Sequence, residues 1–321
     1  MNKSKIEWCD MTYNPITGCL HGCKYCYAEK IAKRFGQFPC ENSNCAICGD
    51  CNLEPSYNCN RYSPCERIHE LDNPVYTYNP KRMQPYPFGF EPTFHRYRLN
   101  EPAKVKKPQK IFVCSMADLF GEWVPDEWID EVFKACEAAP WHTYMFLTKN
   151  PKRYNDAIEM IACEERSFAL SEGYWDKFWF GTTITCQDDV ERVKNLSKFS
   201  EGHKFLSIEP LLSEVKIDLS EYCCPKCNSI YVYQDNPVTT QKGALPFYCE
   251  DCGWEGEKPK PLIEFVIIGQ QTGPGAKPPK DEWVQSIIDQ CKAAGVPIFV
   301  KHPLYEKFPI QEWPKGLEVS K

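Results

Sequence analysis

Three cysteines stand close together near the start of the chain, in the stretch "GCLHGCKYCYAEK" at residues 18–30. Their spacing is C-x3-C-x2-C, and the three positions are Cys19, Cys23 and Cys26. A tetrahedral structural zinc site takes four ligands, whereas a four-iron cluster held by three thiolates leaves one iron open to a small molecule. Three thiols in one loop therefore favour an iron–sulfur cluster with an open iron. A zinc site completed by His21 or Cys9 is the alternative.

A second set of cysteines forms two C-x2-C pairs, within "CCPKC" (223–227) and "CEDCG" (249–253). The positions are Cys224, Cys227, Cys249 and Cys252. Two such pairs separated by a short segment are typical of a zinc ribbon, and a rubredoxin-like single iron is the alternative. The ribbon either staples an insert that is too small to fold alone, or binds nucleic acid through the aromatic residues of "YVYQ" (231–234).

A third set lies in "CENSNCAICGDCNLEPSYNCNRYSPC" (40–65). Its six members are Cys40, Cys45, Cys48, Cys51, Cys59 and Cys65. Six thiols exceed the needs of one tetrahedral site, and the run C-x2-C-x2-C resembles part of a ferredoxin motif. An auxiliary iron–sulfur cluster and a zinc ion held by four of the six are both consistent with this pattern.

The composition indicates in which cellular compartment the protein works and which kinds of partner it can bind. The polar N-terminus "MNKSKIEWCD" lacks the pattern of a signal peptide, which predicts a cytoplasmic protein. In that compartment thiols stay reduced, so the twenty cysteines in 321 residues are expected to bind metal rather than form disulfides. No apolar run approaches the roughly 18 residues of a membrane span, so we expect no membrane association. The net charge of −6 excludes broad electrostatic capture of nucleic acid by the chain as a whole.

Short apolar runs alternate with helical patterns along the chain. The runs that predict strands are "IEW" near the N-terminus and residues 110–115, 143–148, 178–183, 204–209, 264–269 and 297–301. The segments with helical spacing are 126–139, 187–199 and 281–295, each with Asp near its start. Apolar strands separated by helices indicate a parallel sheet. The predicted fold is therefore α/β, as a full or partial (β/α) barrel.

Two cysteine-rich stretches interrupt this alternation and are interpreted as inserts on the barrel. The expected organisation is 1–35 for the first strand, cysteine loop and helix, 36–109 for the first insert, 110–220 for the barrel core, 221–260 for the ribbon insert and 261–321 for the last barrel units.

The cysteine loop resembles the signature of the radical S-adenosylmethionine (SAM) superfamily, because C-x3-C-x2-C carries the aromatic Tyr25 directly before its third cysteine. The chain is also similar to a three-cysteine-motif family of phages, bacteria and archaea that is grouped with radical SAM proteins. The segments that carry this likeness are "IEWCDMTYNPITGC", "FVCSMADLFGEWVPDEWI", "FLTKNPKRY", "LSIEPLL" and "DQCKAAGVPIFVK". Relatives have a wider gap between the first two cysteines and a Gly-Gly-Glu run where this chain has "GQQTG" (269–273).

The resemblance implies a radical SAM barrel whose four-iron four-sulfur cluster is held by the three loop cysteines and cleaves SAM reductively to a 5′-deoxyadenosyl radical. In a βα barrel, the polar residues that bind the ligand lie at the carboxyl ends of strands. The candidates for SAM binding are Tyr25, Ser115, Asp118, Thr148, Thr183, Glu209 and Gln270.

Two functions therefore compete. The first is a radical SAM enzyme that takes its electron from a reductant such as ferredoxin or flavodoxin. Its substrate class is open, with a nucleic acid or nucleotide favoured by the phage-associated relatives, the ribbon and the basic segment "KVKKPQK" (104–110). The second is a metal-stapled nucleic-acid-binding or scaffold protein without catalysis.

Overall fold

The computed structural model describes residues 1–36, 68–76, 83–163, 173–234, 247–273 and 275–317. The chain divides into two compact units, Met1–His142 and Thr143–Lys321, and it is mixed α/β throughout. None of the helices in these ranges is long and apolar enough to cross a membrane.

The strands that the structure describes in unit 1 form two groups. In the first, β1 (Asn2–Lys3) pairs antiparallel with β2 (Met11–Tyr13), and β2 pairs parallel with β6 (Lys110–Val113). In the second, β5 (Thr93–His95) lies between β3 (Ile16–Thr17) and β4 (His69–Leu71). The 3-10 helix η2 (Arg96–Arg98) and the helices α1 (Tyr27–Phe35), α2 (Glu101–Lys104) and α3 (Asp126–Glu137) complete the unit.

The prediction of a first strand at "IEW" is wrong. Residues 6–8 form a turn, in which the Cys9 amide donates to the Ile6 carbonyl at 3.3 Å and the Ile6 amide donates to Ser4 Oγ at 2.9 Å. The turn buries Trp8, whose ring packs against Phe112 at a centroid distance of 4.7 Å. The apolar signal at this point reports a buried turn, and the first strand of the parallel pairing begins at β2.

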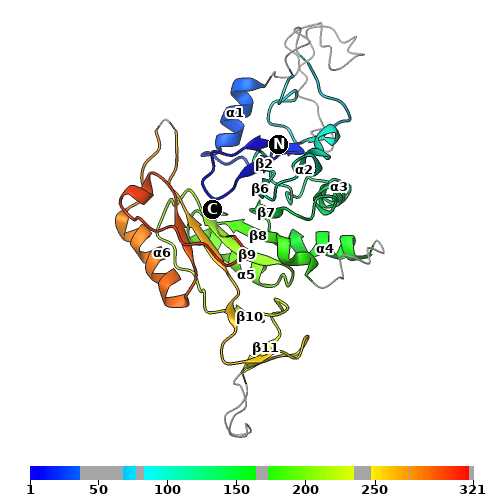
Figure 1. Ribbon diagram of the computed structural model, residues 1–321. Coiled ribbons are helices and arrows are strands. Elements are labelled where there is room, and N and C mark those ends of the chain that lie inside the picture. Colours follow the sequence, from blue (N-terminus) through cyan, green and yellow to red (C-terminus); the bar gives the residue numbers. More distant parts are fainter. Residues whose placement is uncertain (37–67, 77–82, 164–172, 235–246, 274, 318–321) are drawn as a thin grey trace. The chain divides into compact units, whose positions relative to one another are not determined.

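Unit 2 is built on five parallel strands in the order β7-β8-β9-β15-β16. They are β7 (Thr143–Thr148), β8 (Phe178–Thr183), β9 (His203–Ile208), β15 (Phe265–Ile268) and β16 (Ile298–Val300). Figure 1 shows them in green to red with the helices of the unit beside them. These are α4 (Arg153–Cys163), α5 (Glu191–Ser197) and α6 (Asp281–Ala294), with the 3-10 turns η3 (Tyr174–Lys177), η4 (Gln187–Val190) and η5 (Leu304–Glu306). The strand predictions from 143 onward are confirmed within one residue at each end.

The strands of unit 2 are buried along almost their whole length, which is why their sequences are continuous apolar runs. The centre of the sheet is packed tightly at Gly181, which lies opposite Phe205 in the β8–β9 register. A Cβ atom at position 181 would approach the Phe205 ring to 2.5 Å, so only glycine fits there. Within the described part of this unit β7 and β16 do not pair with one another, and the (β/α) barrel stays a prediction.

Five short strands between β9 and β15 lie outside the parallel sheet. β10 (Tyr222–Cys223) pairs with β14 (Lys260–Pro261), and β11 (Val232–Gln234), β12 (Phe247–Cys249) and β13 (Glu255–Gly256) form an antiparallel sheet. We call residues 221–261 the ribbon. Its core consists of Cys224, Val232 and Cys249, with Phe247, Cys252 and Trp254 packed against them. So small a core cannot hold these strands together by apolar burial alone.

Candidate metal centres

The three loop cysteines lie between β3 and α1. Gly18 and Gly22 turn the chain with φ angles of 88° and 64°, and a Cβ atom at position 18 would meet the Glu91 carbonyl oxygen at 2.2 Å. Cys26 is the N-cap residue of α1, where its sulfur accepts a hydrogen bond from the Glu29 amide at 3.3 Å. The local sequence therefore closes the loop and places its third thiol at a helix start.

The loop is fastened to residues 114–118, directly after β6. The Gly18 amide donates to the Met116 carbonyl at 2.9 Å, and the Tyr27 hydroxyl donates to the Ser115 carbonyl at 2.6 Å. Cys114, directly after β6, has a left-handed φ of 58°, which turns the chain at the end of the strand. Three thiols are thus presented on a segment that is held at both of its ends.

His21 and Asp118 make the third connection. His21 Nε2 lies 2.7 Å from Asp118 Oδ2, and the other carboxylate oxygen accepts from the Phe120 amide at 3.1 Å. The His21 ring meets Trp123 edge to face at a centroid distance of 4.9 Å. Because Asp118 is only 6% exposed, its two hydrogen bonds fix the tip of the loop between Cys19 and Cys23.

Burial opposes ionisation of two of the loop thiols, Cys19 and Cys26. Burial raises the pKa of Cys19 to about 12, and the negative charges of Asp118, Cys26 and Cys23 add to the effect. Burial also raises the pKa of Cys26. A cation bound in the loop must therefore displace protons from these sulfurs as it binds.

We expect the loop to depend on Asp118. An Asp118→Ala substitution leaves the partly buried His21 ring and the buried Phe120 amide without their acceptor, which costs about 1–3 kcal/mol. Amide hydrogen exchange over residues 19–26, measured in the metal-free chain by mass spectrometry, should become about tenfold faster or more. Glu122→Ala, which removes an exposed carboxylate nearby in the sequence, is the matched control and should change nothing. Equal exchange in the Asp118→Ala protein and the wild type would contradict this role.

The seven residues that the sequence assigns to SAM binding fall in both units. In unit 1, Tyr25 is half-buried in the loop, and Ser115 and Asp118 follow β6 in contact with the loop. In unit 2 the other four lie at carboxyl ends of parallel strands, as predicted: Thr148, Thr183, Glu209 and Gln270. Their role in binding SAM stays a prediction.

Two of the four are engaged locally. Thr148 is buried, and its hydroxyl accepts from the Asn150 amide at 2.9 Å. The Thr183 carbonyl accepts from Arg192 Nη1 at 2.8 Å. These contacts shape the turns after β7 and β8.

Glu209, in contrast to Thr148 and Thr183, forms an ion pair with a lysine that follows another strand. Lys301, which follows β16, places its Nζ 2.5 Å from Glu209 Oε1. Gly269, at the end of β15, lies beneath the carboxylate, and a Cβ there would approach Glu209 Cδ to 2.8 Å. The carboxyl ends of strands β9, β15 and β16 therefore bring together the Glu209–Lys301 ion pair and Gly269, which packs against the Glu209 carboxylate. The sequence names each residue as a strand end but carries no signal that Glu209 and Lys301 are partners.

The four ribbon cysteines converge as predicted. All four sulfurs lie within 4.8 Å of one another, with Cys224 and Cys252 at 3.6 Å and Cys227 and Cys249 at 3.6 Å. Four thiolates at a Zn–S distance of about 2.3 Å in a tetrahedron would be separated by about 3.8 Å. This group can therefore hold a metal ion.

Both halves of the ribbon site use the same turn. The Asn228 amide donates to the Cys224 carbonyl at 3.0 Å, and the Gly253 amide donates to the Cys249 carbonyl at 3.0 Å. Asn228 and Gly253 are left-handed, with φ angles of 62° and 64°. Asparagine and glycine tolerate this conformation best, so each C-x2-C pair carries its own turn signal.

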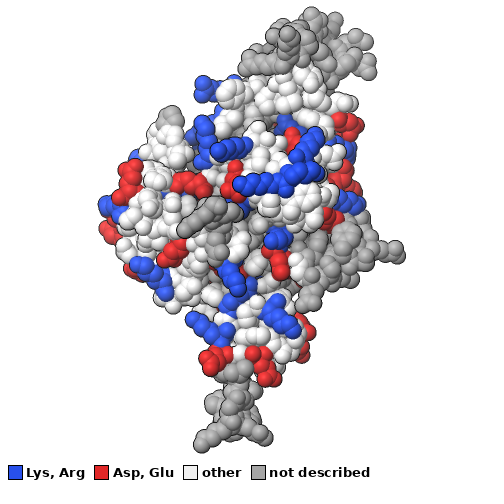
Figure 2. All heavy atoms as spheres, viewed as in Figure 1, with Lys and Arg blue, Asp and Glu red and all other residues white. Residues whose placement is uncertain are grey.

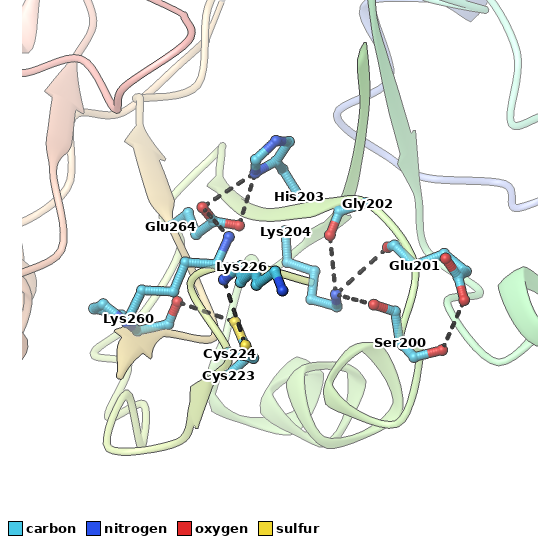
Figure 3. Close-up of polar contacts among 11 residues, drawn as sticks. Ser200, Glu201, Gly202, His203, Lys204, Cys223, Cys224, Lys226, Lys260 and Glu264 are labelled. Atoms are coloured by element: carbon cyan, nitrogen blue, oxygen red, sulfur yellow. Dashed lines mark hydrogen bonds and ion pairs between the residues drawn. The ribbon is translucent and has the colours of Figure 1, made fainter. Parts of the chain in front are cut away.

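A charged network lies where the ribbon joins the sheet (Figure 3). Glu264, just before β15, contacts Lys260 at 2.8 Å and His203 at 3.0 Å. Burial is the largest single influence on the pKa of Glu264 and raises it, but the hydrogen bonds and positive charges of His203 and Lys260 together outweigh burial, so the pKa is lowered. Lys204 is 1% exposed and donates to the carbonyls of Ser200, Glu201 and Gly202, while burial lowers its pKa to about 8. The Lys260–Glu264 pair thereby ties the C-terminal end of the ribbon to the base of the sheet.

The third cysteine set, Cys40 to Cys65, lies outside the described residues, so its auxiliary cluster or zinc ion stays a prediction.

Comparison with known proteins places the chain in a family. No curated protein and no solved structure matches it. One family model, described as "Protein of unknown function (DUF5131)", matches residues 3–306 and so covers the cysteine loop, the parallel strands of both units and the ribbon. On this match across nearly the whole chain, the protein belongs to the DUF5131 family.

Proposed function

We propose that this protein is a radical SAM enzyme that holds a four-iron four-sulfur cluster on Cys19, Cys23 and Cys26. The observation that carries the proposal is the construction of the loop. Three thiols stand on one segment whose ends are fastened to the turn after β6, and the third thiol caps the helix that follows. The donor set is sulfur only, which suits iron–sulfur chemistry.

The zinc alternative for this loop requires a fourth ligand. Cys9 Sγ lies 3.2 Å from Ser4 Oγ in the buried turn at residues 6–9, so recruiting Cys9 would break that turn. His21 contacts Asp118 through Nε2, and its Nδ1 atom is the one that a zinc ion would use, because a histidine with a carboxylate partner is a common zinc ligand. The metal content of the loop therefore distinguishes a three-thiolate iron–sulfur cluster from a zinc site completed by His21.

A cluster bound here would supply the electron that cleaves SAM. The chain's own contribution is to hold the loop that carries the thiols, through the Gly18–Met116, His21–Asp118 and Tyr27–Ser115 contacts, while the Trp123 ring packs against His21 at the loop tip. The electron comes from an external reductant, for which we propose a ferredoxin or flavodoxin. The substrate class favoured by the sequence is a nucleic acid or nucleotide.

For the ribbon we propose a structural zinc ion. A closed set of four thiolates is the usual ligand set of structural zinc. Its sulfur spacing agrees with one tetrahedral ion, and the apolar core around it is too small to fold unaided.

Metal analysis tests the proposal against the non-catalytic alternative. We expect anaerobically purified protein to be brown and to contain iron, sulfide and zinc. Replacing Cys19, Cys23 and Cys26 together by Ala should remove the visible absorbance and about four irons per chain, apart from any iron bound by residues 40–65, and should leave the ribbon zinc in place. The readouts are elemental analysis and absorbance spectroscopy.

Iron content that is unchanged by the triple substitution would show that the loop is not the cluster site. Colourless protein that carries only zinc, even after reconstitution with iron and sulfide, would instead support the metal-stapled binding protein.

A further inference from the structure

The outer face of the ribbon carries a row of aromatic and acidic side chains that the proposed chemistry does not use. The register of the three-stranded sheet places Tyr233 opposite Tyr248, and Tyr248 opposite Glu255. Directly opposed residues on neighbouring strands share a face of the sheet. Tyr233, Tyr248 and Glu255 therefore form one row across β11, β12 and β13.

This row points away from the metal site. Val232 and Cys249 form the preceding opposed pair and are buried in the ribbon core, whereas Tyr233 and Tyr248 are 43% and 41% exposed. Their ring centroids lie 5.5 Å apart. Two large rings held side by side in solvent, on a module whose core is elsewhere, are typical of a binding surface.

Two further residues extend the face. Tyr231, two positions before Tyr233 in sequence, is 52% exposed. Glu250 follows β12, and its amide donates to the Tyr231 carbonyl at 3.0 Å, while its carboxylate lies near enough to the Tyr233 hydroxyl to act on it electrostatically. We call these five residues, Tyr231, Tyr233, Tyr248, Glu250 and Glu255, the tyrosine face.

The charge around the tyrosine face is negative. Residues 221–234 and 247–261 contain five acidic side chains and three basic ones. One of the basic residues, Lys260, is paired with Glu264 at the base of the sheet. Figure 2 shows both acidic and basic side chains on the visible face of the segment that carries β10 and β11. Four thiolates around one Zn²⁺ add a formal charge of −2, so the loaded ribbon repels anions.

We propose that the tyrosine face binds an arginine- or lysine-containing peptide segment of a partner protein. Exposed tyrosine rings attract guanidinium and ammonium groups, and the carboxylates of Glu250 and Glu255 lie where such a group can be paired. Stacking of nucleic-acid bases would use the same rings but would bring phosphates against the acidic residues. Charge complementarity therefore favours the cationic peptide. This inference goes beyond the proposed SAM chemistry and does not depend on it.

The test uses the full-length, zinc-loaded protein and two fluorescein-labelled probes, a short peptide of alternating arginine and glycine and a single-stranded oligothymidylate. Fluorescence anisotropy at near-physiological salt gives the Kd of each. We expect peptide binding to depend on the tyrosine face, and any oligothymidylate binding to be unaffected by changes in that face. The Tyr233→Ala/Tyr248→Ala protein should bind the peptide about tenfold more weakly, and Tyr233→Phe/Tyr248→Phe, which keeps both rings, should bind it within about twofold of wild type.

Matched controls separate this face from general attraction to an acidic protein. Tyr76→Ala and Glu122→Gln change an exposed tyrosine and an exposed acid of unit 1 and should leave the Kd unchanged, whereas Glu250→Gln/Glu255→Gln should weaken binding. Zinc content confirms that each ribbon variant is folded, and the Glu-to-Gln pair decides the matter if the Ala pair loses zinc. Peptide binding that ignores the tyrosine and Glu250/Glu255 changes, tyrosine-dependent binding of oligothymidylate, or a self-associated protein with this face covered would each overturn the proposal.

Discussion

Reduced, cluster-loaded protein is expected to convert SAM to 5′-deoxyadenosine and methionine even without its substrate, slowly, and the Cys23→Ala protein is expected to form neither above background. The physical reason is the ligand count. Three thiolates leave one iron of the cluster without a protein ligand, and SAM can occupy that position. Without Cys23, which lies between the other two thiols in the loop, the cluster loses one of its three attachments.

The measurement is anaerobic incubation with dithionite and SAM, followed by chromatography of the nucleoside products. Cys186→Ala is the matched control, because Cys186 is a partly exposed thiol just before η4 and outside every cysteine group. It should behave as wild type. Wild-type protein shown to hold a full cluster but forming no more 5′-deoxyadenosine than the Cys23→Ala protein would refute the enzymatic proposal. The metal-stapled binding protein would then be the better account.

The second large effect is expected at the ribbon. Cys227→Ser should lower zinc from about one ion per chain to nearly none, because a structural zinc ion contributes about 10–16 kcal/mol of binding free energy to folding and depends on all four thiolates. The ribbon should then unfold, since its apolar core of Cys224, Val232 and Cys249 is too small to hold it without the metal. Elemental analysis and limited proteolysis between residues 221 and 261 measure the two effects.

Cys223 provides a stringent control for this substitution. It is adjacent to Cys224 and as deeply buried, but its thiol is directed to the Pro261 carbonyl at 3.9 Å and it is not one of the four converging sulfurs. Cys223→Ala should therefore keep its zinc. We expect Cys227→Ser to affect zinc and proteolysis far more than SAM cleavage. If it abolished SAM cleavage while zinc stayed bound, the ribbon would instead belong to the catalytic site.

The amino-acid sequence by itself determined the features that depend on neighbours along the chain. The strands of unit 2 were predictable because a parallel strand buried on both faces needs an unbroken apolar run, as β8 and β15 have. The ribbon site was predictable because each C-x2-C pair makes its own turn, so that the spacing along the chain places the two sulfurs of each pair on one turn before the two pairs meet. The same reasoning failed at residues 6–8, where an apolar run serves a buried turn.

Only the tertiary structure decided which distant polar groups meet. His21 and Asp118 are 97 positions apart, and Glu209 and Lys301 are 92 apart, and neither pairing leaves a pattern in the sequence. In the sequence, Lys204 is the first residue of a predicted apolar strand. Its charged side chain is buried, because the carbonyls of three residues before β9 accept hydrogen bonds from its Nζ. A buried charge is stable only with partners, and those partners are set by which strand ends and turns become neighbours in the fold.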